Sequence, residues 1–241
     1  MLFAGQTHVG KVRSRNEDAM GWDEAAQVAV LADGMGGHPA GDVASRLAVN
    51  SALEAVRGRT PEGKNWLGNG GDPKSLIRLV HRTLLAHTQR EPATAGMGTT
   101  LVVAAVDDEH VAVAHVGDSR AYRFHEGRLS HLTRDHNLAQ EALEHERITP
   151  DQFRHSAQRH QLTQAVGVGA EVDPGETRFP RNRGDLVLLC SDGLTGELHD
   201  REIEELLSEH IASPERAARL LVRLAVDRGG SDNVTVVVLR V

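Results

Sequence analysis

The 241-residue chain has the length of one large domain, with 39 % hydrophobic residues, 25 % charged residues and a formal net charge of −7. This composition is typical of a globular protein, and its acidic balance argues against a nucleic-acid partner, which usually meets a basic face. The apolar stretches fall far short of the roughly 18 residues of a membrane helix, and the N-terminus lacks the layout of a secretory signal. We therefore expect a cytoplasmic protein with neither a membrane nor a nucleic-acid partner.

Strands and helices are both predicted along the whole chain. Apolar or alternating runs predict buried or half-buried strands at 28–32, 101–106, 111–116, 186–190 and 234–241. The second and third runs are joined by a short polar connection, which favours an antiparallel hairpin. Helical periodicity covers 41–56, 72–87, 200–211 and 213–230. Asp72 and Pro73 are typical of a helix start, as are Ser213 and Pro214.

Two segments stand apart from this pattern. Residues 58–73 are rich in glycine and polar groups, so we expect an exposed loop. Residues 135–165 are charged and weakly amphipathic, which predicts short helices over the surface beside the sheets. Hairpin-linked strands with helices in blocks favour an α+β fold over a doubly wound parallel sheet.

Aspartates stand at the ends of four predicted strands, namely Asp33, Asp118, Asp192 and Asp232. Any one of them is explained by an ordinary turn, because aspartate bonds to the local backbone there. Strand ends gather on one rim of a layered β structure, however, so the four carboxylates are expected to converge. Converging carboxylates repel one another and need protons or cations. Oxygen ligands of this kind suit Mg²⁺ and Mn²⁺.

Other chemistries find less support in the sequence. There is no zinc-binding His-Glu-x-x-His helix, phosphate-binding Gly-x-x-x-x-Gly-Lys loop or Gly-x-Ser-x-Gly elbow. Cys190, the single cysteine, is interpreted as a small core residue at a strand end. Most histidines have polar neighbours and are expected at the surface, including His81, His87, His145 and His155.

Seven motifs, in order, resemble those of the metal-dependent protein phosphatase 2C family in its bacterial form. They are RSRNEDA at 13–19, LADGMGGHPAG at 31–41, GMGTTLV at 96–102, VGDSRAY at 116–122, LTRDHNL at 132–138, SDGLTGEL at 191–198 and GGSDNVTVVVL at 229–239. The resemblance implies a four-layer αββα sandwich with two central antiparallel sheets. It also implies one catalytic domain over 1–241, with no sensor domain or membrane anchor in it, and a flap at about 139–165.

The resemblance further implies roles for particular residues at two Mg²⁺ or Mn²⁺ ions. Asp33 would bridge the two ions, and the carbonyl of Gly34 would ligate the second. Asp192 and Asp232 would complete the shell of the first ion. Asp118, together with Asp192, matches a weaker third metal site.

Three more residues are assigned by the same resemblance. Asp18, with Glu17, would hold metal-bound water from the second shell, and Arg13 would grip the substrate phosphate. A guanidinium suits that task because its planar fork matches phosphate oxygens. Two divalent ions about 4 Å apart would lower the pKa of a bridging water, and the resulting hydroxide would attack phosphorus in line.

The chain departs from the animal enzymes at Met35, where those enzymes carry a histidine proposed as the general acid. Water bound to the metal is the simpler proton donor here, and His38 is a second candidate. The segment 139–165 also carries extra histidines, so substrate preference cannot be carried over from the family.

Three functions from different classes remain open from the residues. The first is a serine/threonine protein phosphatase acting on phosphoprotein substrates, with a cognate serine/threonine kinase as a partner and a monomeric state. The second is a non-catalytic regulator that binds phosphoproteins, although the four intact aspartates speak against it. The third is a phosphatase of small phosphate esters, which an open metal site would serve equally well.

Overall fold

Two five-stranded antiparallel sheets form the centre of the molecule in this computed structural model, which describes residues 1–35, 40–60 and 64–241. The first sheet has the strand order β1 (Leu2–His8), β10 (Val234–Arg240), β9 (Leu186–Cys190), β6 (Arg120–His125) and β7 (Arg128–His131). The second has the order β2 (Asp18–Asp23), β3 (Val28–Asp33), β4 (Leu101–Val106), β5 (His110–Val116) and β8 (Gly175–Pro180). The predicted hairpin is the β4–β5 pair, in which Leu101 lies opposite Val116.

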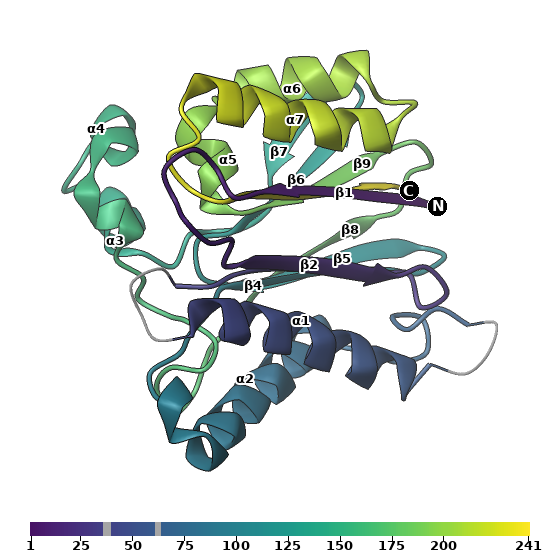
Figure 1. Ribbon diagram of the computed structural model, residues 1–241. Helices are drawn as coiled ribbons and strands as arrows, with labels where there is room; N and C mark the ends of the chain where they lie inside the picture. Colours follow the sequence, from purple (N-terminus) through teal and green to yellow (C-terminus); the bar gives the residue numbers. More distant parts are fainter. Residues whose placement is uncertain (36–39, 61–63) are drawn as a thin grey trace.

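Helices cover the outer face of each sheet, which gives four layers (Figure 1). The second sheet is covered by α1 (Gly41–Arg57) and α2 (Pro73–Arg90). The first is covered by α5 (Asp192–Glu197), α6 (Asp200–Glu209) and α7 (Pro214–Arg228). The α+β fold and the αββα layering expected from the motifs are therefore confirmed.

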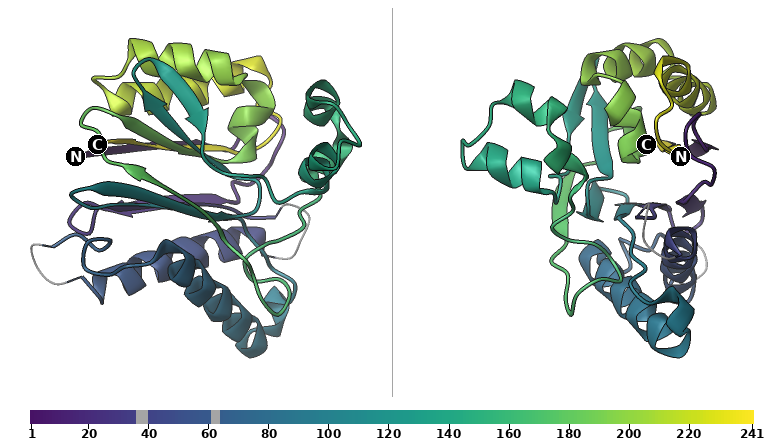
Figure 2. Two further views of the ribbon diagram at one scale, coloured as in Figure 1. Left: turned by 180° about the vertical axis from the view of Figure 1, so that it is seen from behind. Right: turned by 60° about the vertical axis from the view of Figure 1, so that its left-hand side comes forward.

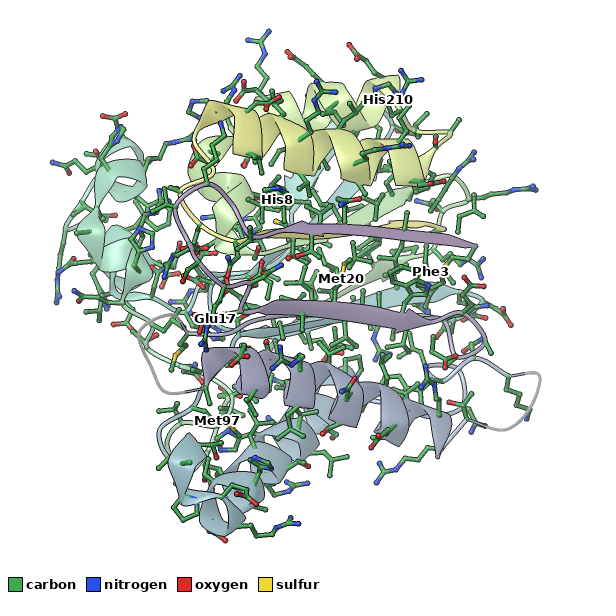
Figure 3. All side chains as sticks on the ribbon, in the orientation of Figure 1. Phe3, His8, Glu17, Met20, Met97 and His210 are labelled. Carbon is green, nitrogen blue, oxygen red and sulfur yellow. The ribbon has the colours of Figure 1, made fainter. Side chains whose placement is uncertain are left out.

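Apolar side chains fill all three gaps between these layers. The gap between the sheets holds fully buried residues such as Leu31 and Leu189, and Phe3 and Met20 reach into it (Figure 3). Met97 belongs to the core under α1 and α2, and Cys190 to the core under α5–α7, as its interpretation as a core residue predicts. Strands buried on both faces read as nearly continuous apolar runs, which is why β3, β4, β9 and β10 were visible in the sequence.

The segment expected to carry short surface helices does so. It contains α3 (Leu138–Glu144), α4 (Pro150–His155) and the 3₁₀ turn η2 (Ala157–His160), and a further 3₁₀ turn, η1 (Pro92–Thr94), follows α2. In Figures 1 and 2, α3 and α4 project from one end of the sandwich, while both chain termini lie at the other end. Among the described residues, no helix is both long and apolar enough to cross a bilayer.

The expectation of an exposed loop at 58–73 is wrong in part. Trp66 and Leu67 are buried against the core of the second sheet, and the Trp66 N–H donates to the carbonyl of Ala26 at 3.0 Å. A Cβ on Gly71 would collide with the indole ring of Trp66. The glycines read as a sign of exposure therefore include one that makes room for a buried ring, and residues 61–63 lie outside the described part of the chain.

Candidate active site

The four strand-end aspartates line one pocket of about 930 Å³ at the end of the sandwich that carries α3 and α4. Asp33 is the last residue of β3, and Asp192 is the first residue of α5, directly after β9 and Ser191. Asp118 follows β5, and Asp232 precedes β10. Arg13, Glu17 and Gly34 line the same pocket, so the expected convergence of the carboxylates is present in the structure.

Hydrogen bonds from the start of β4 fix the end of β3. The carbonyl oxygen of Asp33 accepts from the Thr100 N–H and from the Thr99 hydroxyl, both at 2.8 Å. The Asp33 N–H in turn donates to the Thr100 hydroxyl at 2.9 Å, and that hydroxyl lies 2.7 Å from the hydroxyl of Ser119. With its backbone bonded in this way, Asp33 presents its carboxylate to the pocket.

Gly34 lies where no side chain fits. Its N–H donates to the carbonyl of Glu17 at 3.0 Å. A Cβ at Gly34 would collide with the carbonyl oxygen of Gly41 and lie 2.8 Å from that of Glu17. Both obstacles are backbone atoms, which cannot rotate away, so the close approach of three chain segments requires glycine here.

We accordingly expect Gly34→Ala to lower the free energy of unfolding by at least about 2 kcal/mol, because backbone has to move, and to displace Asp33. Gly58→Ala is the matched control. Gly58 has φ −64°, and among the described atoms the nearest to a Cβ there would be the Glu54 carbonyl oxygen at 3.4 Å. Chemical denaturation of both variants checks this expectation, and equal stabilities would contradict it.

Asp18 is half-buried behind the pocket and lies directly opposite Asp33 in the β2–β3 pair. Its Oδ2 accepts from the Ser191 hydroxyl at 2.8 Å, while its buried Oδ1 has no partner among the described protein atoms. Burial raises the pKa of Asp18 to about 7, against hydrogen bonds from Thr235 and Ser191 that lower it. An unpartnered buried carboxylate oxygen calls for water or a cation.

Burial and the neighbouring carboxylates also raise the pKa values of Asp33 and Asp118 well above the ordinary 3.8. For Asp33 the neighbours responsible are led by Asp18 and Asp192, and for Asp118 by Asp192. Cations bound among these side chains would offset the repulsion. As the side chains stand, no three His, Cys, Asp or Glu residues in the described part of the chain already form a ligand set for one ion. Ligation of one ion by three of these carboxylates would therefore require their side chains to turn toward it, with water completing the shell.

These shifts predict how stability depends on pH when a chelator is present. The pKa of Asp18 is about 7 in the folded protein, against an ordinary value of 3.8. The stability that protonated Asp18 adds to the folded state is therefore fully present below pH 3.8 and is lost as the pH rises through about 7. In chelator, we expect the melting temperature to fall as the pH rises from about 5 to about 8, the range that these pKa values set. Asp18→Asn should make the melting temperature depend less on pH over this range. Differential scanning fluorimetry measures both, and a parallel fall in the variant would contradict the assignment.

Arg13 lies in the connection between β1 and β2, and its side chain lines the pocket. Its Nη2 donates to Asp232 Oδ2 at 2.7 Å. The connection is held by Asn233, whose Nδ2 donates to the carbonyls of Val9 at 2.8 Å and Arg15 at 2.9 Å. Asn233 was not singled out from the sequence. The one feature of the sequence that could have pointed to Asn233 is its position between Asp232 and the last strand.

His160 is a second pocket residue that sequence reasoning did not single out. It ends η2, and its Nδ1 lies 3.4 Å from Asp192 Oδ2. Of the flap histidines, His145 and His155 were expected at the surface, and His160 was given no role. Spacing gave no indication of which one faces the pocket.

Two histidine expectations have different outcomes. His81 was expected at the surface, and this is wrong, because its side chain is buried between α2 and residues 167–170. Polar neighbours along the chain do not reveal which face of a helix a residue occupies. His38, the candidate proton donor, lies outside the described residues.

The comparisons with known proteins agree with this geometry. A family model described as protein phosphatase 2C matches residues 4–225. The crystal structure of the serine/threonine phosphatase PstP/Ppp of Mycobacterium tuberculosis has 35 % sequence identity and a TM-score of 0.86, covering 98 % of this chain and 97 % of that one. The structure of Stp1 from Staphylococcus aureus has 32 % identity and a TM-score of 0.89, covering 99 % and 94 %.

Curated relatives differ in length. The serine/threonine phosphatase stp of Listeria monocytogenes is 35 % identical over 97 % of this chain and 93 % of its own length. PstP of M. tuberculosis is 37 % identical over 99 % of this chain, and the chain spans only 44 % of the PstP length. A further structure shows the PstP catalytic domain in complex with two manganese ions, at 35 % identity, with 98 % and 96 % coverage and a TM-score of 0.83.

The chain shares its fold with bacterial serine/threonine phosphatases of known structure. More particularly, the chain belongs to the protein phosphatase 2C family of Mg²⁺- or Mn²⁺-dependent serine/threonine protein phosphatases.

Proposed function

We propose that this chain hydrolyses phosphoserine and phosphothreonine in proteins, using cations bound in the pocket. The observation that carries the proposal is the pocket itself, which is lined together by Asp33, Asp118, Asp192, Asp232 and Arg13. The four aspartates, together with Arg13, suit cations that in turn bind a phosphate dianion.

Different aspartates would bind each of two cations. Asp33 would reach both, because it lies at the rim where the two sheets meet, and the Gly34 carbonyl would add a ligand to the second. Asp192 and Asp232 would complete the first, and Asp118 with Asp192 would take a weaker third. When bound, such ions neutralise charge at phosphorus and lower the pKa of water so that it becomes a nucleophile.

The remaining residues would bind and orient. Arg13 gives one N–H to Asp232, which leaves a guanidinium with four further donors to hold phosphate oxygens. Asp18 would bind a water through its unpartnered Oδ1. Met35 lines the pocket but has no proton to give, so the donor to the leaving oxygen would be water or His38.

We further propose that the physiological substrates are proteins phosphorylated by a serine/threonine kinase of the same cell. The chain would act as a monomeric domain over 1–241 in the cytoplasm, with 139–165 as a flap beside the pocket. Support for the flap comes from His160, which connects this segment to Asp192, and from the backbone bridge between Asn137 and Leu162.

The experiment is a turnover assay with a phosphothreonine peptide and with p-nitrophenyl phosphate, run with Mn²⁺, Mg²⁺, Ca²⁺ or chelator. The proposal predicts peptide hydrolysis with Mn²⁺ or Mg²⁺, none with chelator, and a large loss in Asp192→Ala. Turnover of the small ester alone would favour the small-molecule phosphatase. Binding of the phosphopeptide with no turnover of either substrate would favour the non-catalytic regulator.

A further inference from the structure

We propose that Asn233 is the positioning residue for Arg13: its side-chain amide ties together the two sides of the loop that carries Arg13, and so aims the guanidinium at the substrate phosphate. The loop is residues 9–17, between β1 and β2, and Asn233 lies between Asp232 and the start of β10. The inference rests on the phosphatase function proposed above and adds a residue on which phosphate binding at that same site depends.

The tip of this loop is open to solvent, so its own side chains hold it weakly. Residues 12–14 are exposed, and the Arg13 side chain is 43 % exposed. The ion pair between Arg13 and Asp232 is therefore partly solvated, and such pairs contribute little to holding a side chain in place. The direction of Arg13 has to be set by how the base of the loop is held.

Asn233 holds both sides of the base of the loop. Its Nδ2 donates to the carbonyl oxygen of Val9 at 2.8 Å, where the loop begins, and to that of Arg15 at 2.9 Å, beyond the tip. Its Oδ1 accepts from the Glu17 N–H at 2.8 Å, where the loop ends. A single amide thus closes the base of the loop on either side of Arg13.

These three bonds require an amide. Two of the partners are carbonyls, which only accept, and the third is an N–H, which only donates, so the orientation of the amide is fixed. Asn233 is 5 % exposed, so losing a bond would leave a buried polar group without its partner, which is costly. A carboxylate of the same shape would keep the bond from Glu17 but would place an oxygen against the carbonyls of Val9 and Arg15.

The backbone of Asn233 is bonded independently of its side chain. Its N–H donates to Asp232 Oδ1 at 2.8 Å, while Asp232 Oδ2 accepts from Arg13. A Cβ on Gly193, which follows Asp192, would collide with the Asn233 carbonyl oxygen, so the start of α5 packs on this backbone. Changing the side chain alone leaves these contacts in place. It therefore releases the loop without releasing the two aspartates.

The first test compares Asn233→Asp with wild type in the turnover of a phosphothreonine peptide with Mn²⁺. We expect kcat/KM to fall roughly tenfold, because a small misplacement of a binding group has effects of this size or larger. In an Arg13→Ala background the same exchange should change kcat/KM by less than about twofold, since the group that Asn233 positions is already gone. A general loss of structure would lower kcat/KM in both backgrounds.

Asn50→Asp is the matched control for this exchange. Asn50 is exposed on α1, so the variant makes the same change from amide to carboxylate without breaking the base of the loop. Its kcat/KM should equal that of wild type.

Two further measurements separate the loop from the metal site. In calorimetric titration with Mn²⁺, Asn233→Asp should bind as many ions as wild type. Limited digestion with trypsin, followed by mass spectrometry, should show faster cleavage after Lys11, Arg13 or Arg15 in the variant, because the exposed tip is no longer held at its base. Asn233→Ser is neutral but too short to reach both sides of the loop, and it should give the same pattern if Asn233→Asp does not fold.

Failure of this inference is distinguishable from failure of the proposed function. Wild-type kcat/KM in the Asn233 variants, an equal fall in the Arg13→Ala background, or a loss of bound Mn²⁺ would overturn the positioning role alone. Failure of the proposed function would appear as no Mn²⁺-dependent turnover of any substrate by wild type. Unchanged tryptic cleavage within residues 11–15 would overturn the positioning role in that case as well.

Discussion

Replacing Asp33 with asparagine is expected to lower phosphopeptide turnover at least about 1000-fold, equivalent to about 4 kcal/mol of transition-state stabilisation. The reason is that Asp33 lies at the centre of the carboxylate cluster and is held there by Thr99 and Thr100. Its pKa is raised well above the ordinary value by burial and by neighbouring carboxylates. The substitution therefore removes a costly buried charge while keeping the shape of the side chain.

The same variant makes a prediction about stability that a damaged fold would not share. In chelator at pH 8, Asp33→Asn should melt at a higher temperature than wild type. Added Mn²⁺, in contrast, should raise the melting temperature of wild type by more than it raises that of the variant. Asp227→Asn is the control, because Asp227 lies near the end of α7 with its carboxylate 62 % exposed. A variant that retains turnover, or that melts lower in chelator, would contradict the role of Asp33.

Replacing Arg13 with alanine should lower kcat/KM for a phosphopeptide by roughly 10- to 100-fold, the range expected for losing charge-assisted hydrogen bonds to phosphate. Arg13→Lys should recover only part of this loss, because lysine keeps the charge but lacks the planar fork. Steady-state kinetics of both variants measure the effect.

Arg201→Ala controls for loss of a surface charge. Arg201 is 87 % exposed, and within the described part of the chain its one ion pair is with Glu205 on the same helix. We therefore expect less than a twofold change, since such pairs contribute little. If Arg13→Lys were as active as wild type, the guanidinium would not be binding phosphate through its fork.

The central strands and long helices were predictable from the sequence for a physical reason. β3, β4 and β9 are buried on both faces and so contain almost only apolar residues. In contrast, every residue of β2 is half-buried, and β7 is largely exposed. Edge strands such as these carry no clear alternation, and their pairing is set by tertiary contacts that a local pattern does not contain.

The aspartates were predictable because each one follows or precedes a readable strand. Asn233, His160 and His81 were not, since their roles depend on which chain segments approach them in space. Asn233 holds a connection more than 200 residues away in sequence, and His81 bonds to a turn 86 residues later. Helical periodicity placed His81 on α2 without revealing that its face is covered.

The account depends most directly on cations being bound by the strand-end carboxylates. Isothermal titration calorimetry of the metal-free protein with Mn²⁺ measures this binding without relying on catalysis. The titration is run at about pH 7.5, which is above the raised Asp18 pKa of about 7. The account predicts at least two Mn²⁺ ions per wild-type chain and loss of binding in Asp192→Ala, with Asp227→Asn binding as wild type does. Absence of Mn²⁺ binding to wild type, or an unchanged stoichiometry and affinity in Asp192→Ala, would contradict it.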